Sequence, residues 1–399
     1  MKIVAIIAEY NPFHNGHQYH IEKALEVTGS DAAIIVMSGD FVQRGAPAIM
    51  PKHLRTHMAL NGGASLVLEL PLPYATGSAE YFAYGAISLL DKLGCVDSIC
   101  FGSECGDITK LQELAKIIAD EPTEYKSYLS EYLKKGFSFP LARQTALHDY
   151  LKSDEFNQIL SSPNNILGIE YLKSLYRLGS RIKPYTIKRI TSNYHDQELQ
   201  ETYSSASAIR NELQKCTLEN LDTQLNKANI TLLKEAFDRK CPIYPNDFSL
   251  LLKYKLMQET KDSLVSYADV SEDLANRILN SLDHYQNFEN FCELLKTKEL
   301  TYARISRALL HILLSIKNES YKEISYARVL GFQKKHADIF STLKQKSTIP
   351  LVTKLADCTL LEELKLDIQA SDLYESVVTD KFHTTFQSEF TKQIVISQN

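Results

Sequence analysis

The stretch that decides the fold is Ile3-Val4-Ala5-Ile6-Ile7-Ala8-Glu9-Tyr10-Asn11-Pro12-Phe13-His14-Asn15-Gly16-His17-Gln18-Tyr19-His20. Its apolar beginning predicts a buried strand, and Asn11-Pro12 predicts a turn before a helix expected from about residue 16 to residue 27. In such a unit Gly16 lets the backbone approach a bulky anion, while the helix start offers unpaired N–H groups and the positive end of its dipole. Two imidazoles, His14 and His17, can then donate hydrogen bonds to the same phosphates. The motif therefore predicts a site for a nucleotide phosphate.

Length and composition bound the class of protein. A chain of 399 residues, 44% hydrophobic and 23% charged, is typical of a soluble globular protein with two domains. No apolar run reaches the roughly 18–20 residues that span a bilayer, and residues 1–8 lack the pattern of a secretory signal. Seven irregularly spaced cysteines favour reduced thiols, so we expect a cytoplasmic protein without a membrane partner. The net charge of −5 argues against a wholly basic protein but allows a local basic face.

The first half of the chain alternates between strand-like and helix-like segments. Strands are expected at residues 2–8, 32–37, 65–70, 98–101 and 182–190, and helices at 16–27, 52–61, 79–93, 108–119, 163–178 and 205–214. Such alternation predicts an α/β fold with a mostly parallel sheet covered by helices. Ligands of these folds lie beyond the carboxyl ends of the strands. We therefore expect Glu9 to His17, Ser38-Gly39-Asp40 and Gly102-Ser103 to converge.

The second half changes character, because Leu, Lys and Glu recur at helical spacing and β-branched runs are few. Asp247 and Ser271 are typical of residues that precede a helix, and residues 302–316 are expected to form another amphipathic helix. The pattern predicts a first domain at residues 1–217 and a mainly α-helical domain at residues 218–399.

A second anion-binding element is Ser204-Ser205-Ala206-Ser207-Ala208-Ile209-Arg210. Alone it is an ordinary helix start with a serine N-cap. Combined with His14-x-Gly16-His17, the turn resembles the second motif of the HxGH nucleotidyltransferase superfamily, a Ser/Thr-rich turn that leads into an Arg-bearing helix.

A closer resemblance follows from neighbouring segments, namely residues 8–17, Met37-Ser38-Gly39-Asp40-Phe41-Val42-Gln43-Arg44-Gly45, Phe101-Gly102-Ser103-Glu104, Pro163-Asn164-Asn165-Ile166-Leu167-Gly168-Ile169-Glu170-Tyr171 and Arg328-Val329-Leu330-Gly331-Phe332. Together they resemble the bacterial tRNA(Met) cytidine acetate ligase family, densely over residues 1–210. The resemblance implies a Rossmann-like HxGH domain followed by a helical, tRNA-binding domain. It also implies ATP-dependent activation of acetate as acetyl-adenylate and acetylation of the wobble cytidine of elongator tRNA(Met) to N4-acetylcytidine.

The resemblance also implies site residues. His14 and His17 would be catalytic and would stabilise the ATP phosphates, as adenylate formation requires oriented donors where charge develops. The implied ATP contacts are Ile7, Ala8, Glu9, Tyr10, Asn11, Pro12, Phe13, His14, Asn15, Gly16, His17, Gln18, Tyr19, His20, Gly102, Asn165, Arg189, Ser205 and Arg210.

Other polar residues leave alternatives open. Lys52 and Arg55 would either neutralise pyrophosphate or form a solvated helix face. Glu9 and Asp40 are candidates for orienting groups or for a Mg²⁺ shell. The spacings of Cys95, Cys100 and Cys105, and of His53 and His57, do not indicate a resident metal site.

Cations and aromatic residues suited to an RNA loop stand in two regions. The candidates for tRNA contacts are Arg181, Lys183, Lys188, Arg304 and Arg328. Two other functions stay open from the residues alone: a small-molecule adenylyltransferase of cofactor biosynthesis, and a non-catalytic module that binds RNA or nucleotide. The sequence does not indicate the oligomeric state or the residues that read the anticodon.

Overall fold

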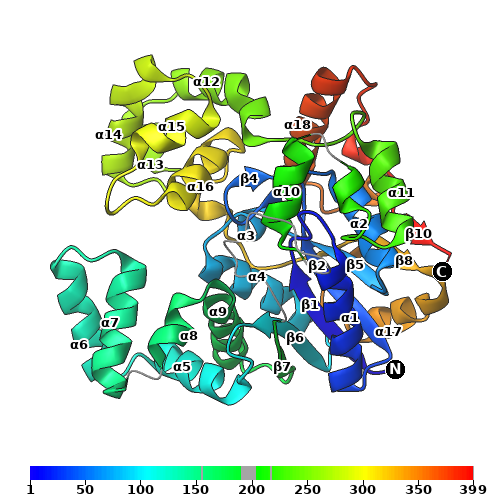
Figure 1. Cartoon of the computed structure of the whole chain (residues 1–399), viewed down its shortest axis with the longest axis horizontal. Helices are drawn as coiled ribbons and strands as arrows, with labels where there is room; N and C mark the ends of the chain where they lie inside the picture. Colours follow the sequence, from blue (N-terminus) through cyan, green and yellow to red (C-terminus); the bar gives the residue numbers. More distant parts are fainter. Residues whose placement is uncertain (154–155, 190–203, 216–217, 399) are drawn as a thin grey trace.

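The computed structural model describes residues 1–153, 156–189, 204–215 and 218–398 (Figure 1). Its centre is an eight-stranded sheet in which every pairing is parallel except that of β5 with β8. The order along the sheet is β10 (Val395–Ser397), β8 (Ala327–Gln333), β5 (Leu66–Leu70), β2 (Ala32–Ser38), β1 (Ile3–Ala8), β6 (Ser98–Ser103) and β7 (Lys183–Lys188), and β9 (Leu351–Val352) pairs with β8.

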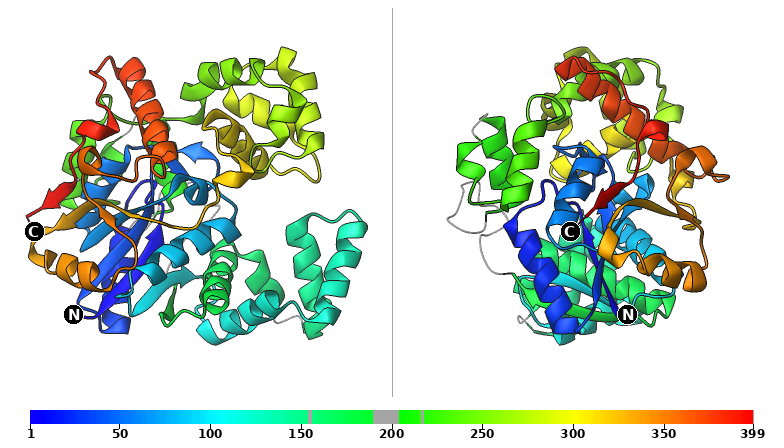
Figure 2. Two further views of the ribbon diagram at one scale, coloured as in Figure 1. Left: turned by 180° about the vertical axis from the view of Figure 1, so that it is seen from behind. Right: turned by 90° about the vertical axis from the view of Figure 1, so that its right-hand side faces the viewer.

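Helices cover both faces of the sheet, which confirms the predicted α/β class (Figures 1 and 2). Side chains of β1 alternate between two cores, with Ile3 and Ala5 in one and Val4 and Ile6 in the other. On the Val4 side lie α1 (Asn15–Thr28), α2 (Lys52–Asn61), α10 (Ala206–Gln214) and α11 (Lys227–Ala236); on the Ile3 side lie α4 (Ala79–Lys92), α5 (Ile108–Asp120), α9 (Pro163–Leu178) and α17 (Ile339–Lys346).

Two groups of helices extend beyond these layers. A hairpin of α6 (Thr123–Lys134) and α7 (Phe139–Leu151) projects on one side, next to α8 (Asn157–Ser161) (Figure 1). A separate hydrophobic core joins α12 (Ser249–Met257), α13 (Lys261–Val265), α14 (Glu272–Ser281), α15 (Phe288–Leu295) and α16 (Tyr302–Leu313). Ser271 caps α14 as predicted, and its hydroxyl accepts the N–H of Leu274.

The chain then returns to the sheet. After α16 it forms β8. Further along, α18 (Lys365–Phe382) packs against α3 (Leu72–Ala75). The short hairpin of β3 (Phe41–Val42) and β4 (Ala46–Pro47) contributes to the same hydrophobic core as these two helices. The prediction of a mainly helical second half is confirmed, but three of its segments are strands of the central sheet. The predicted division at 217/218 therefore does not separate the sheet from the rest of the chain. Of the helices in the described ranges, none is long and apolar enough to cross a membrane.

Candidate active site at the carboxyl ends of β1 and β6

The sheet opens between β1 and β6, at the end where the carboxyl termini of the parallel strands meet. β1 pairs with β2 as far as Ala8, but it pairs with β6 only at Val4 and Ala5. Chain connections leave these two adjacent strands in opposite directions along the sheet, which is the arrangement that creates a ligand crevice in α/β folds. The HxGH turn follows β1 at one side of this opening, and Gly102 lies in β6 at the other.

The turn after β1 is held in one shape by several contacts. Ile7 and Ala8 are half-buried at the strand end, and Tyr10, with φ +48°, is buried against Phe13 and His17. The peptide bond between Asn11 and Pro12 is cis. Asn11 accepts the N–H of Ile49 with its side-chain oxygen at 2.7 Å. The turn is thus anchored to the segment that precedes α2.

His14 and His17 form a reciprocal cap at the start of α1. Nδ1 of His14 accepts the N–H of Gly16 at 3.0 Å, and Nδ1 of His17 accepts the N–H of His14 at 3.3 Å. Their rings stack with centroids 3.8 Å apart. A Cβ on Gly16 would lie 2.9 Å from Cε1 of His14, so the glycine makes room for this ring.

These bonds fix the proton on each ring. A neutral imidazole has one donor and one acceptor nitrogen, and Nδ1 is the acceptor in both residues. Burial, with the charges of Arg189 and Arg210, lowers the pKa of His14 to about 3. Burial and the neighbouring His14 hold the pKa of His17 well below its ordinary value. Both rings are therefore neutral near pH 7 and carry the donor N–H at Nε2.

One expectation about α1 is wrong. The N–H groups at its start are already bonded, since that of Asn15 donates to the carbonyl of Gln224 at 2.9 Å, that of Gly16 donates to His14, and those of His17 and Gln18 donate to the carbonyl of His14. The unpaired N–H groups predicted for this helix start are thus absent at residues 15–18. Beside this helix start, the imidazoles of His14 and His17 carry donors at Nε2.

The Ser204–Arg210 turn contacts the HxGH turn directly. Ser205 caps α10 and accepts the N–H of Ala208 at 3.1 Å. Arg210 donates to the carbonyl of Asn11 at 2.7 Å and to the hydroxyl of Ser207 at 2.9 Å. The structure therefore brings together the two motifs that the sequence paired.

Across the opening, Gly102 and Arg189 lie together. A Cβ on Gly102 would lie 3.2 Å from Cγ of Arg189, so this side chain passes directly over the glycine. The Arg189 charge contributes to the lowered pKa of His14 and of His20, the latter lowered to about 4 chiefly by burial. Asn165 is buried, and its side-chain oxygen accepts the N–H groups of Glu104 and Cys105.

Other predicted ATP contacts have protein partners. The side-chain amide of Asn15 donates to the carbonyl of Thr223 at 2.9 Å. Gln18 bonds Glu22 and Asn226, and Tyr19 is half-buried. The segment containing Thr223, Gln224 and Asn226 was not predicted as part of the site. It contacts both motifs, because the side-chain oxygen of Gln224 also accepts the N–H of Ser204 at 3.0 Å. No spacing or composition signal in the sequence marks it.

Lys52 and Arg55 are neither a solvated face nor a phosphate contact. Both are buried. Lys52 bonds Glu69 and Ser371 and pairs with Glu389, and Arg55 donates to the carbonyls of Met50, Glu9, Ser38 and Gly39. Both expected roles are therefore wrong, and the guanidinium of Arg55 ties the end of β1 to the end of β2.

The predicted tRNA contacts divide into two groups. Arg181, Lys183 and Lys188 are exposed along or beside the edge strand β7, and Arg304 is half-buried on α16. Arg328 is buried in β8, where it donates to the carbonyl of Val352 and lies 3.6 Å from Glu389. Its prediction as a tRNA contact is wrong because the sheet and the C-terminal segment cover it.

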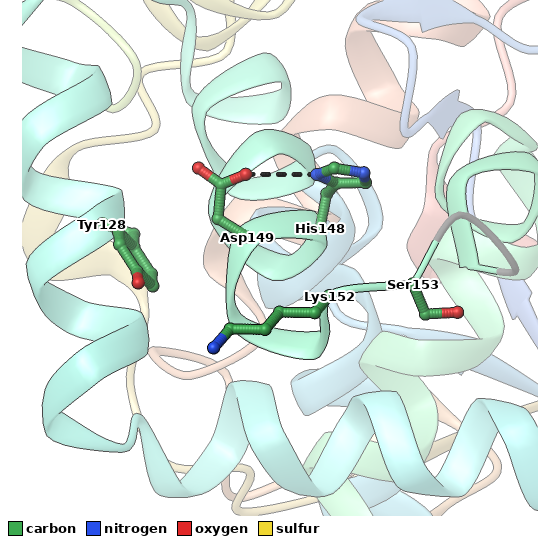
Figure 3. A pocket seen from close by; sticks show the side chains of 5 residues that line it. All are labelled: Tyr128, His148, Asp149, Lys152 and Ser153. Atoms are coloured by element: carbon green, nitrogen blue, oxygen red, sulfur yellow. Dashed lines mark hydrogen bonds and ion pairs between the residues drawn. The ribbon is translucent and has the colours of Figure 1, made fainter.

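A pocket on the α6–α7 hairpin involves other residues (Figure 3). It is lined by Tyr128, His148, Asp149, Lys152 and Ser153, and Nδ1 of His148 lies 3.1 Å from Asp149. None of the residues predicted to contact ATP or tRNA lines it.

The amino-acid sequence matches the HIGH Nucleotidyl Transferase family over residues 1–389. It is 42% identical to the tRNA(Met) cytidine acetate ligase of Acetivibrio thermocellus, with 99% of this chain and 100% of that protein covered. It is 46% identical to the ligase of that name from Clostridium acetobutylicum, with 94% and 96% covered. The fold matches Thermotoga maritima TmcAL in its apo form and bound with alpha-thio ATP, with TM-scores of 0.94 and 0.92, 33% identity and full coverage of both chains. The chain therefore belongs to the HIGH nucleotidyl transferases and, within them, to the tRNA(Met) cytidine acetate ligase family.

Proposed function

We propose that this protein uses ATP to activate acetate as acetyl-adenylate and then acetylates the wobble cytidine of elongator tRNA(Met) to N4-acetylcytidine. The observation that carries the ATP chemistry is the stacked pair His14 and His17, two neutral rings with Nε2–H donors at the opening of the sheet. The identity of the acid and of the RNA is supported by the names of the relatives.

In the proposed first step, a carboxylate oxygen of acetate attacks the α-phosphorus of ATP, and the bond to pyrophosphate breaks. Negative charge grows on the phosphate oxygens, where fixed donors stabilise the transition state. His14, His17 and the cations Arg189 and Arg210 would supply these donors. In the second step the exocyclic amine of cytidine attacks the acetyl carbonyl, AMP leaves, and the amine loses a proton.

Two parts of the proposed ATP site flank the histidines. The backbone of residues 7–13 and Gly102 would border the nucleotide, with Arg189 above Gly102 and Ser205 at the second helix start. Asn165 would act by shaping the loop at Glu104 and Cys105, since its side-chain oxygen is bonded there. Asn15 and Gln18 would also hold the HxGH helix in place, since their side chains bond residues 223–226.

A Mg²⁺ ion at this site would accompany the ATP phosphates. The carboxylate of Glu9 accepts the backbone N–H of Gln43 at 3.0 Å, and that of Asp40 accepts the backbone N–H of Lys52 at 2.7 Å. Each carboxylate is therefore already hydrogen-bonded to the backbone. Within the described residues no three His, Cys, Asp or Glu side chains are placed to share a metal ion. These two carboxylates do not form a metal site by themselves.

For the tRNA, the proposed contacts are Arg181 beside β7, Lys183 and Lys188 at the two ends of β7, and Arg304 on α16. The carboxyl end of β7 leads directly to Arg189, so a basic strip runs along this edge of the sheet toward the opening. Such a strip suits the phosphates of an RNA. The reaction would take place in the cytoplasm, where tRNA and ATP are present.

The experiment incubates the purified protein with ATP, acetate and tRNA, and analyses the tRNA nucleosides by mass spectrometry. We expect N4-acetylcytidine that depends on both ATP and acetate. A dinucleotide formed from a phosphate-bearing cofactor precursor would instead indicate a small-molecule adenylyltransferase. Binding of ATP and RNA without any turnover would indicate a non-catalytic module.

A further inference from the structure

The loop after β6 and the first turn of α9 are joined by reciprocal hydrogen bonds, in which each segment both donates and accepts. The Glu104 carboxylate accepts the N–H of Asn164 at 3.2 Å, the side-chain amide of Asn164 at 2.7 Å and the N–H of Asn165 at 2.9 Å. In return, the Asn165 side chain accepts the N–H groups of Glu104 and Cys105 at 2.9 and 3.2 Å. Glu104 thus occupies the N–H groups at the start of α9, so this helix start does not offer them to a phosphate.

The same bonds decide which way the Asn164 amide points. A carboxylate only accepts hydrogen bonds, so the amide must turn its Nδ2 toward Glu104 and its Oδ1 away from it. That oxygen lies 3.5 Å from Nη1 of Arg189, a guanidinium that only donates. If the amide turned over, donor would face donor at Arg189 and acceptor would face acceptor at Glu104.

Among the described residues, the other contacts of Arg189 are made by its backbone and its stem. Its N–H donates to the carbonyl of Ser103 at 3.0 Å, and its stem passes over Gly102. The residue is exposed, so the end of this long side chain would sample many rotamers without a fixed acceptor. The amide oxygen of Asn164 is the acceptor that the described contacts provide for the guanidinium.

We propose that Glu104 is a positioning residue that, through Asn164, holds the Arg189 guanidinium over Gly102 ready for the phosphates of ATP. The inference rests on the proposed ATP contact of Arg189. Preorganisation of this kind increases affinity because the side chain is ordered before the ligand arrives.

The direction in which Glu104→Gln changes the affinity for ATP distinguishes a positioning role from a purely electrostatic one. Glu104 carries a negative charge close to a site for an anion. Replacing it by glutamine would therefore strengthen ATP binding if only its charge mattered. A positioning role gives the opposite result, because glutamine cannot accept at both of its terminal atoms and one side of the Asn164–Asn165 turn is released.

The test measures the affinity of the full chain for ATP by calorimetry, in a double-mutant cycle of Glu104→Gln and Arg189→Ala. We expect Glu104→Gln to weaken ATP binding about tenfold in the wild-type background, the scale of one hydrogen bond to a charged group. In the Arg189→Ala background we expect a change of less than about twofold, since the group being positioned is gone. Glu113→Gln, which removes the same charge from an exposed position on α5, is the matched control.

Asn164→Ala provides a second variant, because it removes the relay but leaves the bonds of Glu104 to two backbone N–H groups. It should reproduce the loss of ATP affinity and its dependence on Arg189. Tighter ATP binding by Glu104→Gln, or equal losses in both backgrounds, would overturn the positioning role. If Arg189→Ala alone leaves ATP affinity unchanged, the ATP contact of Arg189 itself is wrong, and the role of Glu104 falls with it; acetylation of tRNA by the wild type is tested separately.

Discussion

Nζ of Lys52 lies 2.9 Å from a carboxylate oxygen of Glu389, and both side chains are buried. The pair joins the start of α2 to the C-terminal segment. A carboxylate oxygen of Glu69, in β5, lies 2.8 Å from the same Nζ. Burial alone would lower the pKa of Lys52, but Glu389 and Glu69 raise it above its ordinary value. The amine is therefore charged, and it stabilises the fold at this end of the sheet by pairing with both carboxylates.

Replacing Lys52 should destabilise the protein without a specific effect on ATP. Lys52→Met removes the cation that two buried carboxylates share, and breaking a buried ion pair costs about 3–5 kcal/mol of unfolding free energy. Denaturant unfolding of the variant, with the exposed Lys126→Met as control, measures this loss. A stable Lys52→Met protein with weakened pyrophosphate binding would show that our assignment is wrong.

The imidazole pair should carry adenylate formation. His17→Ala or His14→Ala removes a donor aimed at developing negative charge, so we expect the rate of acetyl-adenylate formation to fall about 100-fold or more. Single-turnover assays with ATP and acetate measure this step apart from tRNA transfer. A loss below tenfold would contradict a transition-state role for the residue that was replaced.

Stability should depend on pH through the buried histidines. Because the pKa of His14 is about 3 in the folded chain and 6.5 in its ordinary state, the unfolded chain binds more protons between these values. The free energy of unfolding therefore decreases as pH falls below about 6.5, by up to about 1.4 kcal/mol per pH unit for such a group.

His14→Asn isolates this contribution, since asparagine also caps helices well. Urea unfolding near pH 7.5 and near pH 5.5 should show a smaller loss of stability for the variant than for the wild type. Equal losses in the two proteins would mean that His14 is not held neutral by the fold.

The basic candidates for tRNA binding should behave differently from one another. Arg181 just before β7 and Lys183 at its first position are exposed. Replacing both with alanine should therefore raise the KM for tRNA about tenfold, through lost phosphate contacts, and spare acetyl-adenylate formation. Arg328→Ala should instead lower the melting temperature, because this buried guanidinium pairs with Glu389. Steady-state kinetics and thermal unfolding of both variants distinguish the roles. A folded, stable Arg328→Ala protein with selectively poor tRNA binding would contradict the assignment from burial.

Local periodicity explains why the first half of the fold could be predicted. The expected strand at residues 2–8 and helix at 16–27 appear as Ile3–Ala8 and Asn15–Thr28, and the helix expected at 108–119 appears as Ile108–Asp120. β8 was not predicted. Its run Arg328-Val329-Leu330-Gly331 is short, follows several helices, and finds its partner β5 only across a large separation in sequence. A short apolar run cannot be assigned to a strand by periodicity alone.

Local pattern alone was enough to predict a strand, a turn and an HxGH helix in succession, and a serine turn with Arg210 that could join them. Which polar groups face the opening depends on the packing of the whole chain. This packing buries Lys52, Arg55 and Arg328 and uses the N–H groups of α1 within the protein. The physical reason is that a motif specifies local backbone and side-chain chemistry, whereas burial and hydrogen-bond partners come from segments far away along the chain.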